Sequence, residues 1–197
     1  DDTPIGTTES DNTVLRTVGT PRSFDFTPKT HWELGQAHDI LDNERAAKVT
    51  GSRFTYLKGE AALLQFALLN FVLGIVTNQE KLSAIIQHAG LSISSRPFIP
   101  VIPPVLIRPE VLHKMDRLEP KDDRYYIPSD NQYLIGSAEH TLGAMHMDEQ
   151  FSEDQMPVRY VGFSTAFRRE AGSYGKDVHG IIRLHQFDKL ELESFSL

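Results

Sequence analysis

Alternation of polar and apolar residues is clearest between residues 159 and 192. It predicts two strands, the first ending at Phe167–Glu170 and the second running from about Gly180 to Leu192, joined by a polar loop over 171–179. Side chains alternate between the two faces of a strand, so the second strand has one apolar face and one mixed face. The apolar face, which we expect to be core, carries Ile182, Leu184, Leu190 and Leu192; the mixed face carries Arg183, His185, Phe187, Lys189 and Glu191.

A long apolar segment precedes this hairpin. Residues 59–76 are apolar nearly all round, which predicts a helix that is either buried or shared with a partner chain. Glu60, Gln65, Asn70 and Gly74 interrupt it, so it is a poor membrane span. Asn78 is placed to cap a second helix, which Gly90 ends.

Shorter elements complete the pattern. Residues 98–107 predict an apolar strand whose prolines favour a sheet edge, and Pro109 suits the first position of a short helix. We also expect a helix over 44–49 and strands over 53–58, 125–128 and 133–135. Residues 1–30 are polar and punctuated by glycine and proline, as in a linker or sheet edge, with Val14, Leu15 and Val18 in a short strand.

Composition narrows the class of protein. The 197 residues are 40% hydrophobic and 24% charged, which is ordinary for one globular domain. The chain contains no cysteine, so it has neither disulfides nor thiolate metal sites, and this fits the cytosol. The net charge of −7 makes the chain as a whole a poor nucleic-acid binder, so contacts with RNA would require basic patches or other segments.

Candidate chemistry lies on the mixed face of the second predicted strand. Arg183, Phe187 and Glu191 follow one another at four-residue steps and span roughly 27 Å. A phosphate-binding cation, an aromatic ring and an amine-binding carboxylate suit an extended ligand such as a nucleotide joined to an amino acid. The alternative is an ordinary hairpin with one solvated face.

We predict no resident metal. His140, His146, Asp148 and Glu149 carry possible ligands, but the six-residue spacing of the histidines is not the i, i+4 arrangement of a helical zinc pair. Structural zinc sites usually recruit thiolates, which this chain lacks. The chain also has no phosphate-binding P-loop and no Gly-x-Gly-x-x-Gly motif.

The hairpin sequence also carries a family resemblance. Residues 167–191, FRREAGSYGKDVHGIIRLHQFDKLE, resemble motif 2 of the class II aminoacyl-tRNA synthetases in the form found in seryl-tRNA synthetases. Gly136–His140, GSAEH, is similar to the Gly-Thr-Ala-Glu-His of that family, with Ser137 in place of threonine. His31–Gly35, HWELG, resembles the opening of the catalytic domain, and the apolar helix followed by the proline-rich strand resembles motif 1, which forms a dimer interface.

The resemblance implies a fold and a division of the chain. The fold class would be α/β (α+β), a class II synthetase-like antiparallel sheet flanked by helices. Residues 31–197 would form a partial catalytic domain, with motif 1 at about 59–107, the serine-binding region at 125–149 and motif 2 at about 159–192. No motif 3 and no helical tRNA-binding arm are recognisable, so we expect an incomplete domain with little activity of its own.

The resemblance also implies an activity for the intact protein: serine–tRNA ligase, an ATP-dependent enzyme of translation. ATP and Mg²⁺ would be required, with L-serine and tRNA(Ser) as the other partners, in a cytoplasmic homodimer without membrane attachment. The implied ATP-binding residues are Arg168, which is also the catalytic residue, Arg169, Glu170, Arg183 and Phe187. The implied serine-binding residues are Ser137, Ala138, Glu139, Arg168 and Glu191.

Specific roles follow from the same resemblance. Arg168 would bridge the serine carboxylate and the α-phosphate, Arg183 would meet the outer phosphates, and Phe187 would stack on adenine. Glu170 would hold the adenine amino group, and Mg²⁺ would bridge phosphate oxygens. Two alternatives remain open: a non-catalytic ATP-binding or dimerisation module with this fold, and a ligase that loads an amino acid onto a carrier other than tRNA.

Overall fold

The structure, a computed structural model, describes residues 5–171 and 180–197. The chain separates into two units, Asp1–Thr30 and His31–Leu197. In the first unit, one 3-10 turn, η1 (Glu9–Asp11), is held by the Asp11 carboxylate, which accepts hydrogen bonds from the main-chain N–H groups of Thr7 and Thr8 at 2.8 and 2.9 Å. The short strand predicted here is wrong, because Val14, Leu15 and Val18 are exposed and lie outside any strand.

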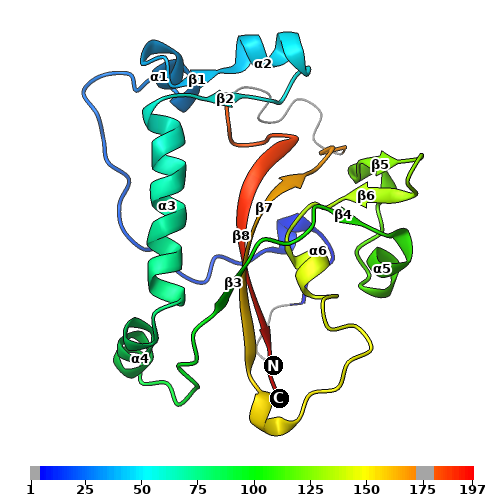
Figure 1. The fold of residues 1–197 in the computed structure, drawn as a ribbon. Coiled ribbons are helices and arrows are strands. Elements are labelled where there is room, and N and C mark those ends of the chain that lie inside the picture. The colour runs from blue at the N-terminus through cyan, green and yellow to red at the C-terminus, as the bar shows by residue number, and fades with distance from the viewer. Residues whose placement is uncertain (1–4, 172–179) are drawn as a thin grey trace. The chain divides into compact units, whose positions relative to one another are not determined.

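The second unit is built on a long antiparallel hairpin (Figure 1). Strand β7 (Val158–Phe167) pairs with β8 (Gln186–Phe195) along its whole length, and β3 (Ile99–Val101) joins the other edge of β7 in parallel. The predicted hairpin is confirmed, but β8 begins at Gln186 rather than at Gly180, because β7 ends at Phe167 and leaves the earlier residues without a partner strand. The predicted loop over 171–179 lies, from residue 172 on, outside the described residues.

Different helices lie on the two faces of this hairpin. Helix α6 (Glu139–Leu142) packs on one face, and α3 (Glu60–Val76) lies on the opposite side (Figure 1). The close approach of α6 depends on Gly162, where a Cβ atom would lie 2.4 Å from Leu142 Cδ1. Ala138, Leu142 and Tyr160 form the buried core on this side, with Phe195 at its margin.

The face toward α3 is only partly covered, and the predicted core is wrong for Ile182 and Leu192, whereas Leu184 and Leu190 are half-buried. Ile182 and Leu184 precede β8, and Leu192 is 49% exposed, because α3 covers this face only in part. A cavity of about 660 Å³ separates the helix from the hairpin, with Leu64 on the helix and Leu190 on β8 among its lining residues.

Helix α3 itself is also exposed. Val76 is its only buried residue, so of the two predicted alternatives burial within the chain is wrong, and burial against a partner chain stays a prediction. The large apolar side chains that it presents to solvent are Leu63, Leu64, Phe66, Leu68 and Phe71.

A second, smaller sheet lies beside the hairpin on the α6 side (Figure 1). Its strands are ordered β4 (Leu106–Ile107), β6 (Gln132–Leu134) and β5 (Tyr126–Ile127), all antiparallel. Helix α5 (Pro109–Lys114) completes its core through Leu112, which packs with Ile107, Tyr133 and Ile135. The single strand predicted over 98–107 is wrong: it is divided between β3 and β4, because Pro103 and Pro104 interrupt the backbone donors that a continuous strand needs.

The remaining elements frame these sheets. Helix α1 (His31–Ala37), strand β1 (Leu41–Asp42), helix α2 (Asn43–Val49) and strand β2 (Tyr56–Leu57) precede α3. Helix α4 (Gln79–His88) follows it and is capped by the Asn78 side chain, as predicted. Two 3-10 turns, η2 (Lys121–Asp123) and η3 (Glu153–Gln155), lie in the connections. The fold is therefore mixed, with antiparallel sheets flanked by helices, as expected.

No single helix among the described residues is long and apolar enough to cross a membrane. Helices α3 and α4 satisfy the length and composition test only when taken together, and they are bent by 75° at their junction.

Candidate active site

The two sheets meet at the turn that leads from β6 into α6. The main-chain N–H of Phe167, the last residue of β7, donates to the Ile135 carbonyl at 2.8 Å. This bond places the turn Gly136–Ala138 against the end of the hairpin. A Cβ atom at Gly136 would lie 2.8 Å from Arg124 Nη1 and 3.5 Å from the Phe167 carbonyl oxygen, so this crowded turn suits glycine.

A hydroxyl, a carboxylate and an ammonium group converge beside this turn. Ser137 Oγ donates to Glu191 Oε2 at 2.5 Å, and Lys189 Nζ lies 3.0 Å from Ser137 Oγ and 2.6 Å from Glu191 Oε2. Lys189 and Glu191 share a face of β8, as the alternation predicts, and Glu191 pairs with Gly162 across the hairpin. Lys189 was not among the site residues predicted from the sequence, although its position on the mixed face was a sufficient signal.

The charge state of this group is set by its neighbours. Burial alone would raise the pKa of Glu191, but hydrogen bonds from Lys189 and Ser137 outweigh burial and hold that pKa below its ordinary value. Glu193, two residues further on the same face, has the opposite environment: burial and the charges of Glu139 and Glu191 raise its pKa. Of these two glutamates, Glu191 is therefore the one held in its anionic form.

Arg168 lies immediately beyond the end of β7. Its Nε donates to the Gly136 carbonyl at 3.0 Å, and its guanidinium carbon is 5.4 Å from the centre of the Phe187 ring. Among the residues that the structure describes, no carboxylate lies within ion-pair distance of Arg168. Its positive charge also lowers the pKa of Glu191, which links it electrostatically to the Ser137–Lys189–Glu191 group.

Glu170 and Arg183 form a second pair near the hairpin tip. Arg183 Nη1 lies 2.5 Å from Glu170 Oε2, so the structure brings these two predicted ATP-binding residues together. Glu170 has a left-handed backbone with φ of 54°, a conformation that is uncommon outside glycine. This backbone turn lies two residues after Arg168, where the chain leaves the hairpin ladder.

Three predicted site residues have other partners. Arg169 packs on Tyr125, with its guanidinium carbon 4.8 Å from the ring centre, and its Nε donates to the Arg124 carbonyl. Glu139 forms an ion pair with Arg117 at 3.1 Å rather than joining Ser137 and Glu191. Ala138 is fully buried in the α6 core.

A buried histidine forms a hydrogen bond with the Gly136–Ala138 turn. His140 is 3% exposed, and its Nδ1 accepts a hydrogen bond from the Gly136 N–H at 3.3 Å. Burial, together with the positive charge of Arg124, lowers the pKa of His140 to about 4, so the ring is neutral at pH 7. Arg117 and Arg124 border the site but lie in an irregular segment, and no sequence pattern marked either of them.

The described residues contain no group of three or more histidine, aspartate or glutamate side chains placed to hold a metal ion. His146, one of the possible ligands named from the sequence, instead contacts Glu149 and the Tyr160 hydroxyl, each at 2.7 Å. Its ring also packs against Phe151 and Phe195, so its surroundings are those of an aromatic cluster.

Comparison with known proteins gives a consistent result. Residues 123–197 match the family model of the tRNA synthetase class II core domain (G, H, P, S and T). The serine–tRNA ligase of Acidothermus cellulolyticus is 47% identical over 197 residues, covering 100% of this chain and 43% of that protein. The serine–tRNA ligase of Thermobifida fusca is 44% identical over 192 residues, covering 97% and 41%. The chain thus spans less than half the length of these curated relatives.

Solved structures agree with the sequence matches. The crystal structure of seryl-tRNA synthetase from Pyrococcus horikoshii complexed with ATP superposes with a TM-score of 0.70 at 37% identity, covering 86% of this chain and 34% of that one. The cytoplasmic serine–tRNA ligase of Naegleria fowleri in complex with AMP gives 0.72 at 29% identity, covering 94% and 40%. The fold is thus that of a class II aminoacyl-tRNA synthetase core. Within that class, the chain belongs to the seryl-tRNA synthetase family.

Proposed function

We propose that the protein containing this chain is a serine–tRNA ligase. The serine carboxylate oxygen would attack the α-phosphorus of ATP, forming seryl-adenylate and releasing pyrophosphate. A terminal ribose hydroxyl of tRNA(Ser) would then attack the seryl carbonyl, and AMP would leave. Both steps depend on positioning and charge stabilisation rather than on a protein nucleophile.

One observation carries this proposal: a guanidinium with no carboxylate partner among the described residues lies close to an ammonium-binding group. Arg168 is held by the Gly136 carbonyl and the Phe187 ring, which leaves its charge available to an incoming anion. Ser137 and Glu191 already bind the primary ammonium of Lys189. A ligand with an anion at one end and an ammonium at the other, such as an amino acid, therefore suits this place.

The resemblance to the family suggests the remaining roles. Arg168 would contact the serine carboxylate and the α-phosphate, because a planar guanidinium can bind two oxygens at once. Phe187 would stack on adenine, Glu170 would accept a hydrogen bond from the adenine amino group, and Arg183 would bind the outer phosphates. Ser137 and Glu191 would bind the serine ammonium and hydroxyl. We retain Arg169, Ala138 and Glu139 only as neighbours of the site, because each has a different partner.

Magnesium would enter with ATP rather than as a resident ion. The described residues offer no ready-made group of metal ligands, and Mg²⁺ commonly binds phosphate oxygens while keeping several waters. Bound in this way, it would neutralise phosphate charge. We assign no reaction step to it.

The same proposal includes a second copy of the chain. The exposed apolar side chains of α3 form a surface of the kind that usually marks an interface. We propose a homodimer through α3 and the proline-rich segment 98–107, in the cytoplasm, where tRNA is charged. Sedimentation of the full-length protein should give twice the monomer mass, and a stable monomer would contradict this part of the proposal.

The activity can be tested by serine-dependent exchange of pyrophosphate into ATP in the full-length protein. We expect Arg168→Ala to lower the exchange rate by about 10²–10³-fold, because it removes a preorganised charge at the reacting phosphate. Phe187→Leu should mainly raise the KM for ATP, because stacking acts alike in the ground and transition states. Arg16→Ala, which changes an exposed arginine of the first unit, is the matched control and should leave exchange unchanged.

Different negative results have different meanings. Exchange with another amino acid but not with serine would refute the serine assignment and leave the class intact. Absence of exchange with every amino acid would favour a non-catalytic module. Exchange without subsequent charging of tRNA would favour a carrier other than tRNA.

A further inference from the structure

His185 and Arg168 are joined by two hydrogen bonds just beyond the last pair of the β7–β8 ladder. The Arg168 N–H donates to the His185 carbonyl at 2.9 Å, and His185 Nδ1 lies 2.9 Å from the Arg168 carbonyl oxygen. A carbonyl can only accept, so Nδ1 must carry the proton. The imidazole thus supplies a side-chain donor where the two strands part.

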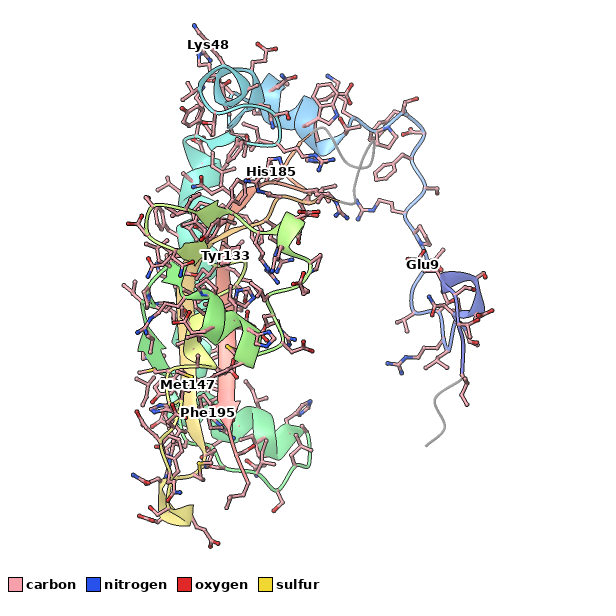
Figure 2. The ribbon with its side chains drawn as sticks, turned by 90° about the vertical axis from the view of Figure 1, so that its right-hand side faces the viewer. Glu9, Lys48, Tyr133, Met147, His185 and Phe195 are labelled. Atoms are coloured by element: carbon pink, nitrogen blue, oxygen red, sulfur yellow. The ribbon has the colours of Figure 1, made fainter. Side chains whose placement is uncertain are left out.

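The imidazole is itself held by contacts from distant parts of the chain. Its ring centre lies 5.4 Å from that of Phe54 and 6.3 Å from that of Tyr125, and the His185 N–H donates to the Arg53 carbonyl at 3.0 Å. Figure 2 shows His185, which immediately precedes the first residue of β8, above Tyr133 of the second sheet. The ring is therefore a fixed point to which the Arg168 backbone can be anchored.

Arg168 needs such an anchor because its backbone lies at the end of regular structure. The hairpin ladder stops at the pair Phe167–Gln186, and two residues after Arg168 the chain turns through the left-handed conformation of Glu170. A catalytic group must be held within about 0.5 Å of its productive position. A displacement of about 1 Å can lower a rate roughly 100-fold.

We propose that His185 is a positioning residue for Arg168: its Nδ1–H bond to the Arg168 carbonyl fixes where the guanidinium enters the site. This inference rests on the proposed function, in which Arg168 contacts the reacting phosphate. His185 is not among the residues proposed to bind either substrate. It acts through the main chain of Arg168, while the Gly136 carbonyl steadies the other end of the same residue.

Two substitutions separate the donor from the ring. In His185→Asn, the side-chain amide can take the place of Nδ1 and still donate to the carbonyl. In His185→Gln, the amide lies one carbon further out, near the position of Nε2, and cannot. Both variants remove the ring that packs near Phe54 and Tyr125, so each serves as the control for the other.

We expect serine-dependent exchange in the full-length protein to distinguish the two variants. His185→Gln should lower kcat about 10–100-fold with a smaller change in the KM for serine, because the substitution displaces the reacting group and leaves the serine-binding side chains in place. His185→Asn should keep kcat within about threefold of wild type, and both variants should be fully folded in the absence of urea. Equal kcat values for the two variants would overturn the proposal.

A second measurement does not depend on activity. Long-range ¹H–¹⁵N NMR of the wild-type protein should show the His185 proton on Nδ1, and an unprotonated Nδ1 would overturn the proposal even if both variants failed to fold. Absence of exchange in the wild type together with a protonated Nδ1 would instead refute the proposed function and leave the anchoring of Arg168 standing.

Discussion

Acid should destabilise this fold through His140. In the folded chain its pKa is lowered to about 4, whereas an unfolded histidine titrates near 6.5. Above pH 6.5 both states are neutral at this residue, so it makes no pH-dependent contribution. As the pH falls below 6.5 the unfolded chain binds a proton that the folded chain refuses, so stability is lost progressively until about pH 4.

The size of the effect follows from the two pKa values. At pH 5 the titration of this one residue lowers the free energy of unfolding by about 2 kcal/mol relative to neutral pH. At still lower pH the reduction reaches about 3 kcal/mol. Most charges around the ring work in the same direction: Arg124, Arg117 and Arg168 oppose its protonation, whereas Glu139 favours it. Protonation would also remove the lone pair that accepts the Gly136 N–H.

His140→Asn isolates this contribution. The asparagine side-chain oxygen can accept the Gly136 N–H from nearly the same place, but it does not titrate. We would measure urea unfolding by circular dichroism at pH 7 and pH 5 for both proteins, so that all other titrations cancel in the comparison. Wild type should lose about 2 kcal/mol more than the variant. Equal losses would show that the ring is not the buried neutral group described here.

Two further predictions concern packing and serine binding. Gly162→Ala should lower the free energy of unfolding by about 1–3 kcal/mol, because its Cβ would overlap Leu142. Gly74→Ala on exposed α3 should instead raise the free energy of unfolding by up to about 1 kcal/mol. Urea unfolding measures both changes, and an unaffected Gly162 variant would argue against the α6 contact. Glu191→Gln should raise the KM for serine at least roughly tenfold and leave the KM for ATP nearly unchanged, because the serine ammonium loses its counter-charge. Steady-state exchange kinetics measure both constants. An equal rise in the two would contradict the proposed role of Glu191.

The local elements were predictable because each has its own chemical signal. Alternation defined the β7–β8 hairpin, Asn78 marked the start of α4, and Pro109 marked the start of α5. The incorrect predictions concern elements whose length or exposure depends on the segments that pack against them. The second strand of the hairpin was predicted to begin six residues too early because its pattern continues beyond the end of its partner β7. Helix α3 has an apolar sequence whatever covers it, so composition alone could not show that it is exposed.

The sequence could group candidate site residues only where they lie on the same strand. Phe187, Lys189 and Glu191 are on one face of β8, and alternation places them there without knowledge of any other residue. Arg117 and Arg124 gave no such signal, because an irregular segment has no periodicity from which the direction of a side chain can be inferred. Their contacts with Glu139 and with the Gly136 turn depend on how the second sheet lies against the hairpin.

The joint between the two sheets therefore determines whether the site exists. The bond from the Phe167 N–H to the Ile135 carbonyl brings the Gly136 turn to the end of the hairpin, and the turn then supplies the carbonyl that holds Arg168 and the hydroxyl that holds Glu191. The two halves of the site are thus fixed by one set of main-chain contacts. A shift of the turn would move Arg168 and the Ser137–Glu191 pair together, which is the coupling that the proposed joining of a carboxylate to a phosphate requires.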